Sequence, residues 1–290
     1  MSQTPPLVAS RGLAGSVRRP GPAAALLAAF PMILALTLIG GLILAGFFLP
    51  LPYNPIHPNV YQLQLPPSRA HLFGTDDAGF DVFSRIIAAS DHDLPLAMLG
   101  TLFAAVIGVP LGLLASSRGT LGGGIMRIVD AFQAFPVLVV AVVLVTLAGN
   151  HLENVILAIG IINVPRFIRL VRSESLVLRA SRFVEAAIAV GNPPARVLFI
   201  HVLPNVAATV LAQAALAVAN AIIVIAGLNF LGVGVSPPEP TWGSMLATGA
   251  TTIAQGVWWM TIFPALAILL CVMAFNILAD SVGQLMRIAD

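Results

Sequence analysis

The sequence predicts an all-α integral membrane protein with six transmembrane helices. Two observations lead to this fold class. The 290 residues are 58% hydrophobic and only 9% charged, whereas a soluble domain usually carries roughly 25% charged residues. The apolar residues also gather in six separate segments, most of which approach the roughly 20 residues that a helix needs to cross a bilayer. A lipid bilayer is therefore the expected surrounding of most of the chain.

The first apolar segment follows a polar stretch. Residues 1–22 are rich in Pro, Gly and Arg, and we expect them to form a disordered cytoplasmic tail. The run at 23–50 is far longer than the roughly 7–15 residue apolar core of a signal peptide. No small-residue cleavage site follows it. We therefore expect a retained first transmembrane helix at 23–50.

Five more apolar segments follow an outer loop that we expect at 51–93, ending in a short helix at about 81–89. Together they form a core expected at 94–285. Their approximate limits are 94–116, 125–148, 152–172, 206–232 and 257–280. Three of them contain a proline: Pro110, Pro136 and Pro264. These prolines are expected to kink the helices, and they can be tolerated because neighbouring helices satisfy the backbone groups that a proline frees.

Arginines set the expected orientation, because all 14 Lys and Arg residues are Arg and positively charged loops stay in the cytoplasm. The arginines on one side are Arg11, Arg18, Arg19, Arg118, Arg127, Arg166, Arg169, Arg172, Arg179, Arg182, Arg196 and Arg287. Both termini and the stretch 173–203 are therefore expected in the cytoplasm, and the loops 51–93 and 233–256 outside. The protein is expected to be a multi-pass membrane protein.

The inner stretch between the fourth and fifth segments predicts a helix, a tight turn and a second helix. Few helix breakers interrupt 175–190, and Gly191 suits the left-handed conformation that ends a helix. Asn192 is a good N-cap and Pro193 fits a first helical position, so a second helix is expected to run to about Leu203. The alternative is an amphipathic helix that lies on the inner leaflet.

Other residues carry smaller predictions. Asp130 lies one helical turn after Arg127, so we expect a structural ion pair rather than a proton relay. Gly108 and Gly112 are expected to allow close helix packing. The Pro-rich loop at 236–243 is a candidate outer gate or docking point for an external binding protein, although a plain turn fits nearly as well. Its candidate residues are Pro237, Pro238, Trp242 and Gly243.

Several classes of function find no support in the sequence. There is no phosphate-binding loop of the G-x-x-x-x-G-K-[ST] type, and no nucleophile–base pair is visible, so we expect a transport subunit rather than an enzyme. The acidic residues and histidines of the outer loop lack the spacing of a metal site. A net charge of +2 gives no reason to expect nucleic acid as a partner.

Residues 185–204 read Glu185-Ala186-Ala187, three residues, Gly191, nine residues, and His201-Val202-Leu203-Pro204. This pattern resembles the EAA loop of the permease subunits of type I ABC importers. His201 stands where the general pattern has Ile, and a His there is typical of the dipeptide/oligopeptide (and nickel) branch.

Other stretches resemble the C-type permease of the same branch, and the resemblance covers roughly 25–285. They are His71-Leu72-Phe73-Gly74-Thr75-Asp76, Gly79 to Arg85, Met126 to Asp130, Ala134-Phe135-Pro136, Leu228 to Val235, Pro237 to Gly243, and Ala274-Phe275-Asn276 followed by Asp280. The sequence departs from the branch at Phe80, where an Arg is expected.

The resemblance implies the type I ABC importer permease fold, with the EAA loop at 173–204 as a cytoplasmic coupling element between helices 4 and 5. Its ATPase-coupling residues would be Glu185, Ala186, Ala187, Gly191, Leu203 and Pro204. The implied partners are a homologous second permease, two ABC ATPase subunits that hold ATP and magnesium, and an extracytoplasmic substrate-binding protein. No cofactor is expected on this chain, and the implied location is the bacterial cytoplasmic membrane.

The implied cargo is a di- or oligopeptide, and the same machinery importing nickel or another small solute is the alternative. Two rival functions remain. A secondary transporter would need no ATPase and predicts an internal repeat with charges near mid-membrane; no clear repeat is visible and the charges lie near the segment ends. A membrane anchor or assembly factor would contain no pore.

Overall fold

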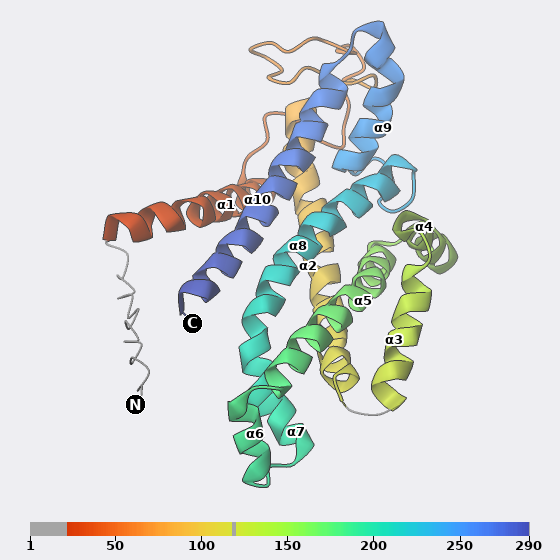
Figure 1. Cartoon of the computed structure of the whole chain (residues 1–290). Coiled ribbons are helices and arrows are strands. Elements are labelled where there is room, and N and C mark those ends of the chain that lie inside the picture. Colours follow the sequence, from red (N-terminus) through yellow and green to blue (C-terminus); the bar gives the residue numbers. More distant parts are fainter. Residues whose placement is uncertain (1–21, 118–119, 290) are drawn as a thin grey trace, which may run out of the picture.

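The structure, a computed structural model, describes residues 22–117 and 120–289 and consists of helices joined by loops (Figure 1). In chain order the helices are α1 (Pro22–Phe48), α2 (Val82–Ala115), α3 (Thr120–Gln133), α4 (Val137–Ala148), α5 (Leu152–Arg179), α6 (Arg182–Ala189), α7 (Pro194–Arg196), the π-wound η1 (Val197–Val202), α8 (Leu203–Phe230), α9 (Trp242–Thr252), the 3₁₀ turn η2 (Ile253–Gln255) and α10 (Trp259–Ala289). Most of the expected tail, with Arg11, Arg18 and Arg19, and also Arg118 lie outside the described residues.

Within the described ranges, five helices are long and apolar enough to cross a membrane. They are Phe30–Phe48 within α1, α2, α5, Pro194–Phe230 and Trp259–Gln284 within α10. The segment expected at 125–148 is not one straight span, because α3 and α4 meet at an angle of 89°. The expected kink at Pro136 is therefore a full break, and the sixth predicted crossing is present only if this bent pair counts as one.

The ends of two predicted elements differ from expectation. The second span begins at Val82 rather than at residue 94, so the short helix expected at 81–89 is its first part and the loop expected at 51–93 ends at residue 81. With 34 residues, α2 is about 51 Å long, which exceeds the roughly 30 Å hydrocarbon core of a bilayer. The outer loop expected at 233–256 contains a helix of its own, α9.

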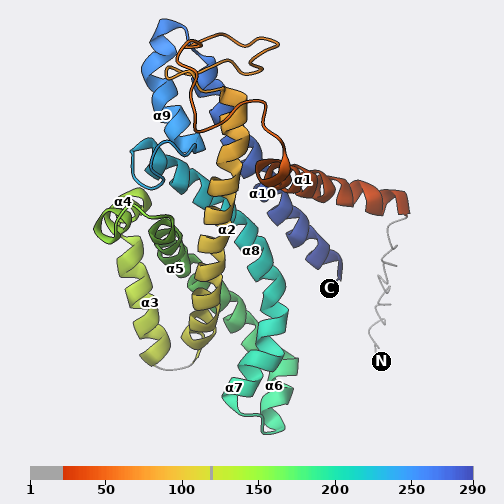
Figure 2. The same ribbon diagram turned by 180° about the vertical axis from the view of Figure 1, so that it is seen from behind.

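The long helices pack through small residues. A Cβ added to Gly108 would lie 2.6 Å from the Cβ of Phe167, and one added to Gly112 would lie 2.7 Å from the Cβ of Val171. Both neighbours belong to α5, so the prediction of close packing at these two glycines is confirmed. In Figures 1 and 2, α2, α5, α8 and α10 run along the molecule, whereas α1 crosses α10 and points away from it.

The two ends of the molecule carry different structures. The loop at 51–81 and α9 lie at one end, and α6 and α7 lie at the other, as both views show (Figures 1 and 2). The predicted orientation would place the first end outside the cell and the second end in the cytoplasm. The two ends are treated separately below.

Candidate functional site

The helix–turn–helix exists, but its first helix is shorter than predicted. The helix expected at 175–190 is interrupted at Ala180 and Ser181, where α5 ends and α6 begins. Ser181 Oγ donates a hydrogen bond to the carbonyl of Leu178 (2.5 Å) and thereby stabilises the turn. The tight turn falls at Gly191 as expected, with φ of +86°, a conformation that favours glycine.

The second helix begins one residue later than predicted. Asn192 was expected to begin the second helix as its N-cap, but its Nδ2 donates to the carbonyl of Ala187 (2.8 Å) and so caps the end of α6. Pro193 is the N-cap residue and Pro194 takes the first helical position, where a missing N–H costs nothing. The second helix continues through η1 into α8 without a break.

One buried side chain fixes α6 to the membrane helices. Val184 is completely buried in a cluster to which α2, α5, η1 and α8 all contribute. The other buried members are Leu113, Val171, Val197, Leu198, Val202 and Val206, with Leu203 packed against them. A displacement of α6 must therefore move this cluster, and with it the ends of three long helices.

The opposite face of α6 is free. Glu185 and Ala186 are exposed and Ala187 is half-buried, and exposed apolar side chains, Ile188 and Val190, follow them. Gly191 has open space around it, since an added Cβ would meet no atom within 4 Å. Four of the predicted coupling residues thus share one accessible region. Leu203 and Pro204 lie at the start of α8, where Leu203 packs against the buried cluster and Pro204 is exposed.

Arginines fasten the end of α2 to the neighbouring helix. Arg172 Nε donates to the carbonyl of Ala115 (3.1 Å), and Arg179 Nη1 donates to the carbonyl of Ser116 (2.9 Å). Carbonyl groups at a helix C-terminus lack partners within the helix and carry partial negative charge, so cations stabilise them. A cavity of about 490 Å³ adjoins this junction, and Arg179 and Glu185 are among its lining residues. The junction therefore has both a rigid base and room for a partner side chain.

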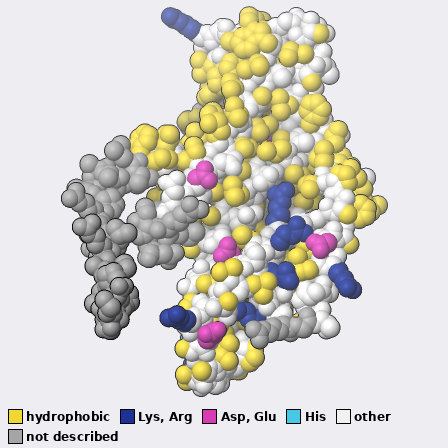
Figure 3. All heavy atoms as spheres, viewed as in Figure 1, with side chains coloured by type: hydrophobic (Ala, Val, Ile, Leu, Met, Phe, Trp, Pro, Cys, Tyr) yellow, Lys and Arg dark blue, Asp and Glu magenta, His cyan; other side chains and the backbone are white. Residues whose placement is uncertain are grey.

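The ion pair predicted within α3 is not formed. Asp130 Oδ1 accepts a hydrogen bond from Arg169 Nη2 of α5 (2.7 Å) instead of pairing with Arg127. The two side chains are 62% and 53% exposed, so the pair joins α3 to α5 at the surface. Figure 3 shows that dark-blue basic side chains gather over α5 and α3 on this face.

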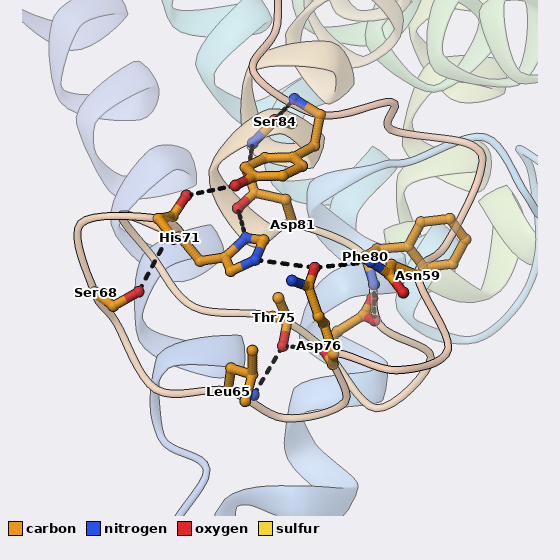
Figure 4. A network of polar contacts seen from close by, with 12 residues as sticks. Asn59, Leu65, Ser68, His71, Thr75, Asp76, Phe80, Asp81 and Ser84 are labelled. Atoms are coloured by element: carbon orange, nitrogen blue, oxygen red, sulfur yellow. Dashed lines mark hydrogen bonds and ion pairs between the residues drawn. The ribbon is translucent and has the colours of Figure 1, made fainter.

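The loop at 51–81 folds into a cap at the other end of the molecule, and the motif at 71–85 holds it together (Figure 4). Asp81 caps α2 by accepting from Ser84 N–H (2.8 Å), and its second oxygen accepts from His71 Nδ1 (2.8 Å). Thr75 Oγ1 donates to the carbonyl of Gln62 (2.6 Å) and accepts from Leu65 N–H (2.8 Å). These residues hold the loop in one conformation, a role that the sequence pattern alone did not identify.

Phe80, which stands where an Arg was expected, packs against a buried cation. The guanidinium carbon of Arg85 lies 4.1 Å from the centre of the Phe80 ring, a cation–π geometry. Arg85 Nη1 also donates to the carbonyl of Pro55 (3.1 Å). Asp76 accepts from Ala78 N–H and Phe80 N–H. Burial nevertheless raises the pKa of Asp76, an effect that these hydrogen bonds and Arg85 only partly offset.

The four candidate residues of the Pro-rich loop at 236–243 fall into two groups. Pro237 and Pro238 are exposed. Trp242 is completely buried, and its backbone N–H donates to Asp93 Oδ2 (2.9 Å). A Cβ on Gly243 would collide with the carbonyl oxygen of Ala226. Trp242 and Gly243 therefore anchor α9, and only the two prolines are placed where a partner can touch them.

Comparison with known proteins gives one consistent result. The family profile described as binding-protein-dependent transport system inner membrane component matches residues 108–288. The chain is 39% identical over 253 residues to the dipeptide transport system permease protein DppC of Alkalihalophilus pseudofirmus, with 86% of this chain and 82% of that protein covered. It is 37% identical to the probable D,D-dipeptide transport system permease protein DdpC of Escherichia coli, with 81% and 80% covered.

A further relative is also a transport permease, and one solved structure has a similar fold. The glutathione transport system permease protein GsiD of Pectobacterium atrosepticum is 40% identical, with 74% of this chain and 71% of that protein covered. A chain of the inward-facing MetNI methionine ABC transporter has a TM-score of 0.55 at 19% identity, with 70% of this chain and 95% of that chain covered. The solved structure supports the fold alone.

Proposed function

This chain belongs to the binding-protein-dependent transport system inner membrane components, and on that premise we propose that it forms half of the path by which an importer moves di- or oligopeptides into the cell. Membership makes it a multi-pass permease subunit of an ABC importer rather than an enzyme, with ATP hydrolysis on a separate subunit. The peptide cargo is supported by the names of the relatives, which refer to dipeptides, D,D-dipeptides and glutathione.

The coupling role rests on the two faces of α6. Its accessible face carries Glu185 and Ala186, and its other face inserts Val184 into the cluster shared with α2, α5 and α8. Small residues let a helix lie in a groove of a partner, and a carboxylate can accept hydrogen bonds from it. We propose that an ATPase subunit, with ATP and magnesium bound, grips this face. The burial of Val184 in the cluster shared with the long helices is the observation that carries the coupling proposal.

The remaining partners follow from the same assignment. A second, homologous permease would complete the path as a heterodimer, and two ATPases would each grip one coupling element. The arginine distribution supports cytoplasmic termini, which would place the cap at 51–81 and the exposed Pro237 and Pro238 outside, where a substrate-binding protein docks. ATP binding would then favour one conformation of the path and hydrolysis would restore the other.

The test combines co-purification with transport. Gly191→Trp and deletion of 185–192 should abolish co-purification of the ATPase subunits and ATP-dependent peptide uptake in proteoliposomes. Gly256→Trp is the matched control, because Gly256 has the same φ of +86° and open space around it but lies near the cap. ATPase binding and uptake that survive both changes at 185–192 would refute the coupling role.

A further inference from the structure

A cavity lies at the break between α3 and α4. Its volume is about 250 Å³, slightly below the roughly 300–1,000 Å³ of sites that enclose a whole small ligand. Its apolar wall consists of Phe132, Phe135, Val137, Val140 and Ile162. Two polar side chains, Gln133 and Arg166, complete the lining. Such a cavity suits one end of a ligand better than a whole peptide.

Arg166 occupies an unusual position for an arginine. It lies near the middle of α5, about 21 Å along the helix from Leu152, and α5 is long and apolar enough to cross a membrane. Charged side chains within membrane-spanning helices are costly and typically face a partner or a water-filled path. The position therefore needs an explanation that packing does not supply.

The other three arginines of α5 have strong partners, and Arg166 does not. Arg169 pairs with Asp130 at 2.7 Å, and Arg172 and Arg179 bind carbonyl groups at the end of α2. Among the described residues, Arg166 forms no ion pair, and its one side-chain hydrogen bond is a long contact of 3.4 Å to Asn163 Oδ1. Most of the donor capacity of its guanidinium is thus available to the cavity.

We propose that Arg166 receives the C-terminal carboxylate of a peptide in transit, while the apolar wall of the cavity holds the terminal side chain. This inference rests on the proposed peptide transport. A guanidinium matches a carboxylate with two parallel hydrogen bonds. An unmodified linear peptide has this carboxylate whatever its sequence, so one arginine provides recognition that tolerates many side chains. Val137, the first residue of α4, borders the same cavity, and the partial positive charge of a helix start adds to the attraction.

The experiment uses the complete transporter in proteoliposomes, with its ATPases, second permease and binding protein. A panel of dipeptides identifies one that the wild type imports, and its uptake is compared with that of its C-terminal amide. Arg166→Gln should reduce uptake of the free acid by about tenfold to a hundredfold, as expected for the loss of a hydrogen-bonded charge. The variant-to-wild-type ratio should stay near one for the amide. Each substrate is compared between the variant and the wild type, so any preference of the binding protein for the free acid or the amide cancels in the ratio.

Controls separate recognition from assembly. Arg127→Gln removes an exposed arginine of α3 that is not among the lining residues of this cavity, and it should leave both ratios unchanged. Arg166→Lys keeps the charge but loses the paired geometry, so it should reduce uptake of the free acid less than Arg166→Gln does, and it remains informative if Arg166→Gln fails to assemble.

Different results would refute carboxylate recognition by Arg166 and the proposed peptide transport. Equal loss of free acid and amide in the Arg166 variants would refute carboxylate recognition and indicate a structural role. Wild-type uptake of the free acid by Arg166→Gln would refute it as well. If the assembled wild type hydrolyses ATP but imports no dipeptide of the panel, the proposed function itself is wrong.

Discussion

The indole N–H of Trp259 donates a hydrogen bond to the carbonyl oxygen of Thr75 (3.0 Å), and this bond joins the start of α10 to the cap at 51–81. Both residues are buried. The neighbouring Trp258 is 48% exposed. The two adjacent tryptophans therefore form a natural pair for testing what holds the cap in place.

Trp259→Phe is expected to loosen the cap. The change leaves the Thr75 carbonyl buried without this donor, which typically costs roughly 1–3 kcal/mol. Hydrogen exchange of the amides of 59–81 should accelerate, while α5 should be unaffected. Trp258→Phe should leave the exchange unchanged. Equal effects of the two substitutions would show that the hydrogen bond to Thr75 does not hold the cap.

Gly112→Ala is expected to destabilise the packing of α2 against α5. The added methyl group would lie 2.7 Å from Val171 Cβ and 2.9 Å from the carbonyl oxygen of Ile168, and such overpacking typically costs roughly 1–3 kcal/mol. Gly123→Ala in α3 is the control, because nothing lies within 4 Å of its added Cβ and alanine favours a helix by about 1 kcal/mol. In detergent, the midpoint temperature of thermal unfolding should be lower than that of the wild type for Gly112→Ala and higher for Gly123→Ala.

Neighbouring residues of α6 are expected to separate stability from coupling. Val184→Ala empties part of the buried cluster and should lower the free energy of unfolding by roughly 2 kcal/mol. Glu185→Ala changes an exposed side chain, so it should leave thermal stability unchanged and reduce co-purification of the ATPase. Undiminished ATPase binding in the Glu185 variant would remove this carboxylate from the proposed interface.

Asp76 is expected to make the cap less stable as the pH rises. Burial raises the pKa of Asp76 in the folded protein above its unfolded value, so the folded state binds the proton more tightly. Its contribution is most favourable below the unfolded pKa of about 4 and is lost as the pH rises through the raised folded pKa. Asp76→Asn keeps an oxygen that can accept from Ala78 and Phe80 and removes the charge.

The variant should therefore be more stable than the wild type at about pH 8, and the difference should shrink towards about pH 4. Hydrogen exchange of the cap across this range measures the effect. A difference that grows as the pH falls would mean that the ionised carboxylate stabilises the cap.

The sequence predicted where the apolar helices lie, because lipid imposes length and composition on them. It placed the start of α2 too late for a physical reason. Asp91, His92 and Asp93 interrupt the apolar pattern, yet the helix continues through them because Asp93 accepts the backbone N–H of Trp242, a residue that is distant in sequence. Tertiary partners of this kind leave no local signal.

The same limit applies to the candidate sites. Local spacing offered Arg127 as the partner of Asp130, whereas the crossing of α3 and α5 brings Arg169 to it. The turn at Gly191 was predictable because its left-handed backbone selects glycine. The interruption at Ala180 and Ser181 was not, because it contains neither Gly nor Pro and depends on Val184 reaching its cluster.

The anchoring of α9 limits how the proposed path could open at the end that carries the cap. The indole N–H of Trp242 donates to the carbonyl of Ile86 in α2, and Gly243 packs against the backbone of Ala226 in α8. With these contacts in place, α9 cannot move independently on its connecting loops. Because α9 is fixed to α2 and α8, the proposed movement at the opposite end of these two helices would carry α9 with them.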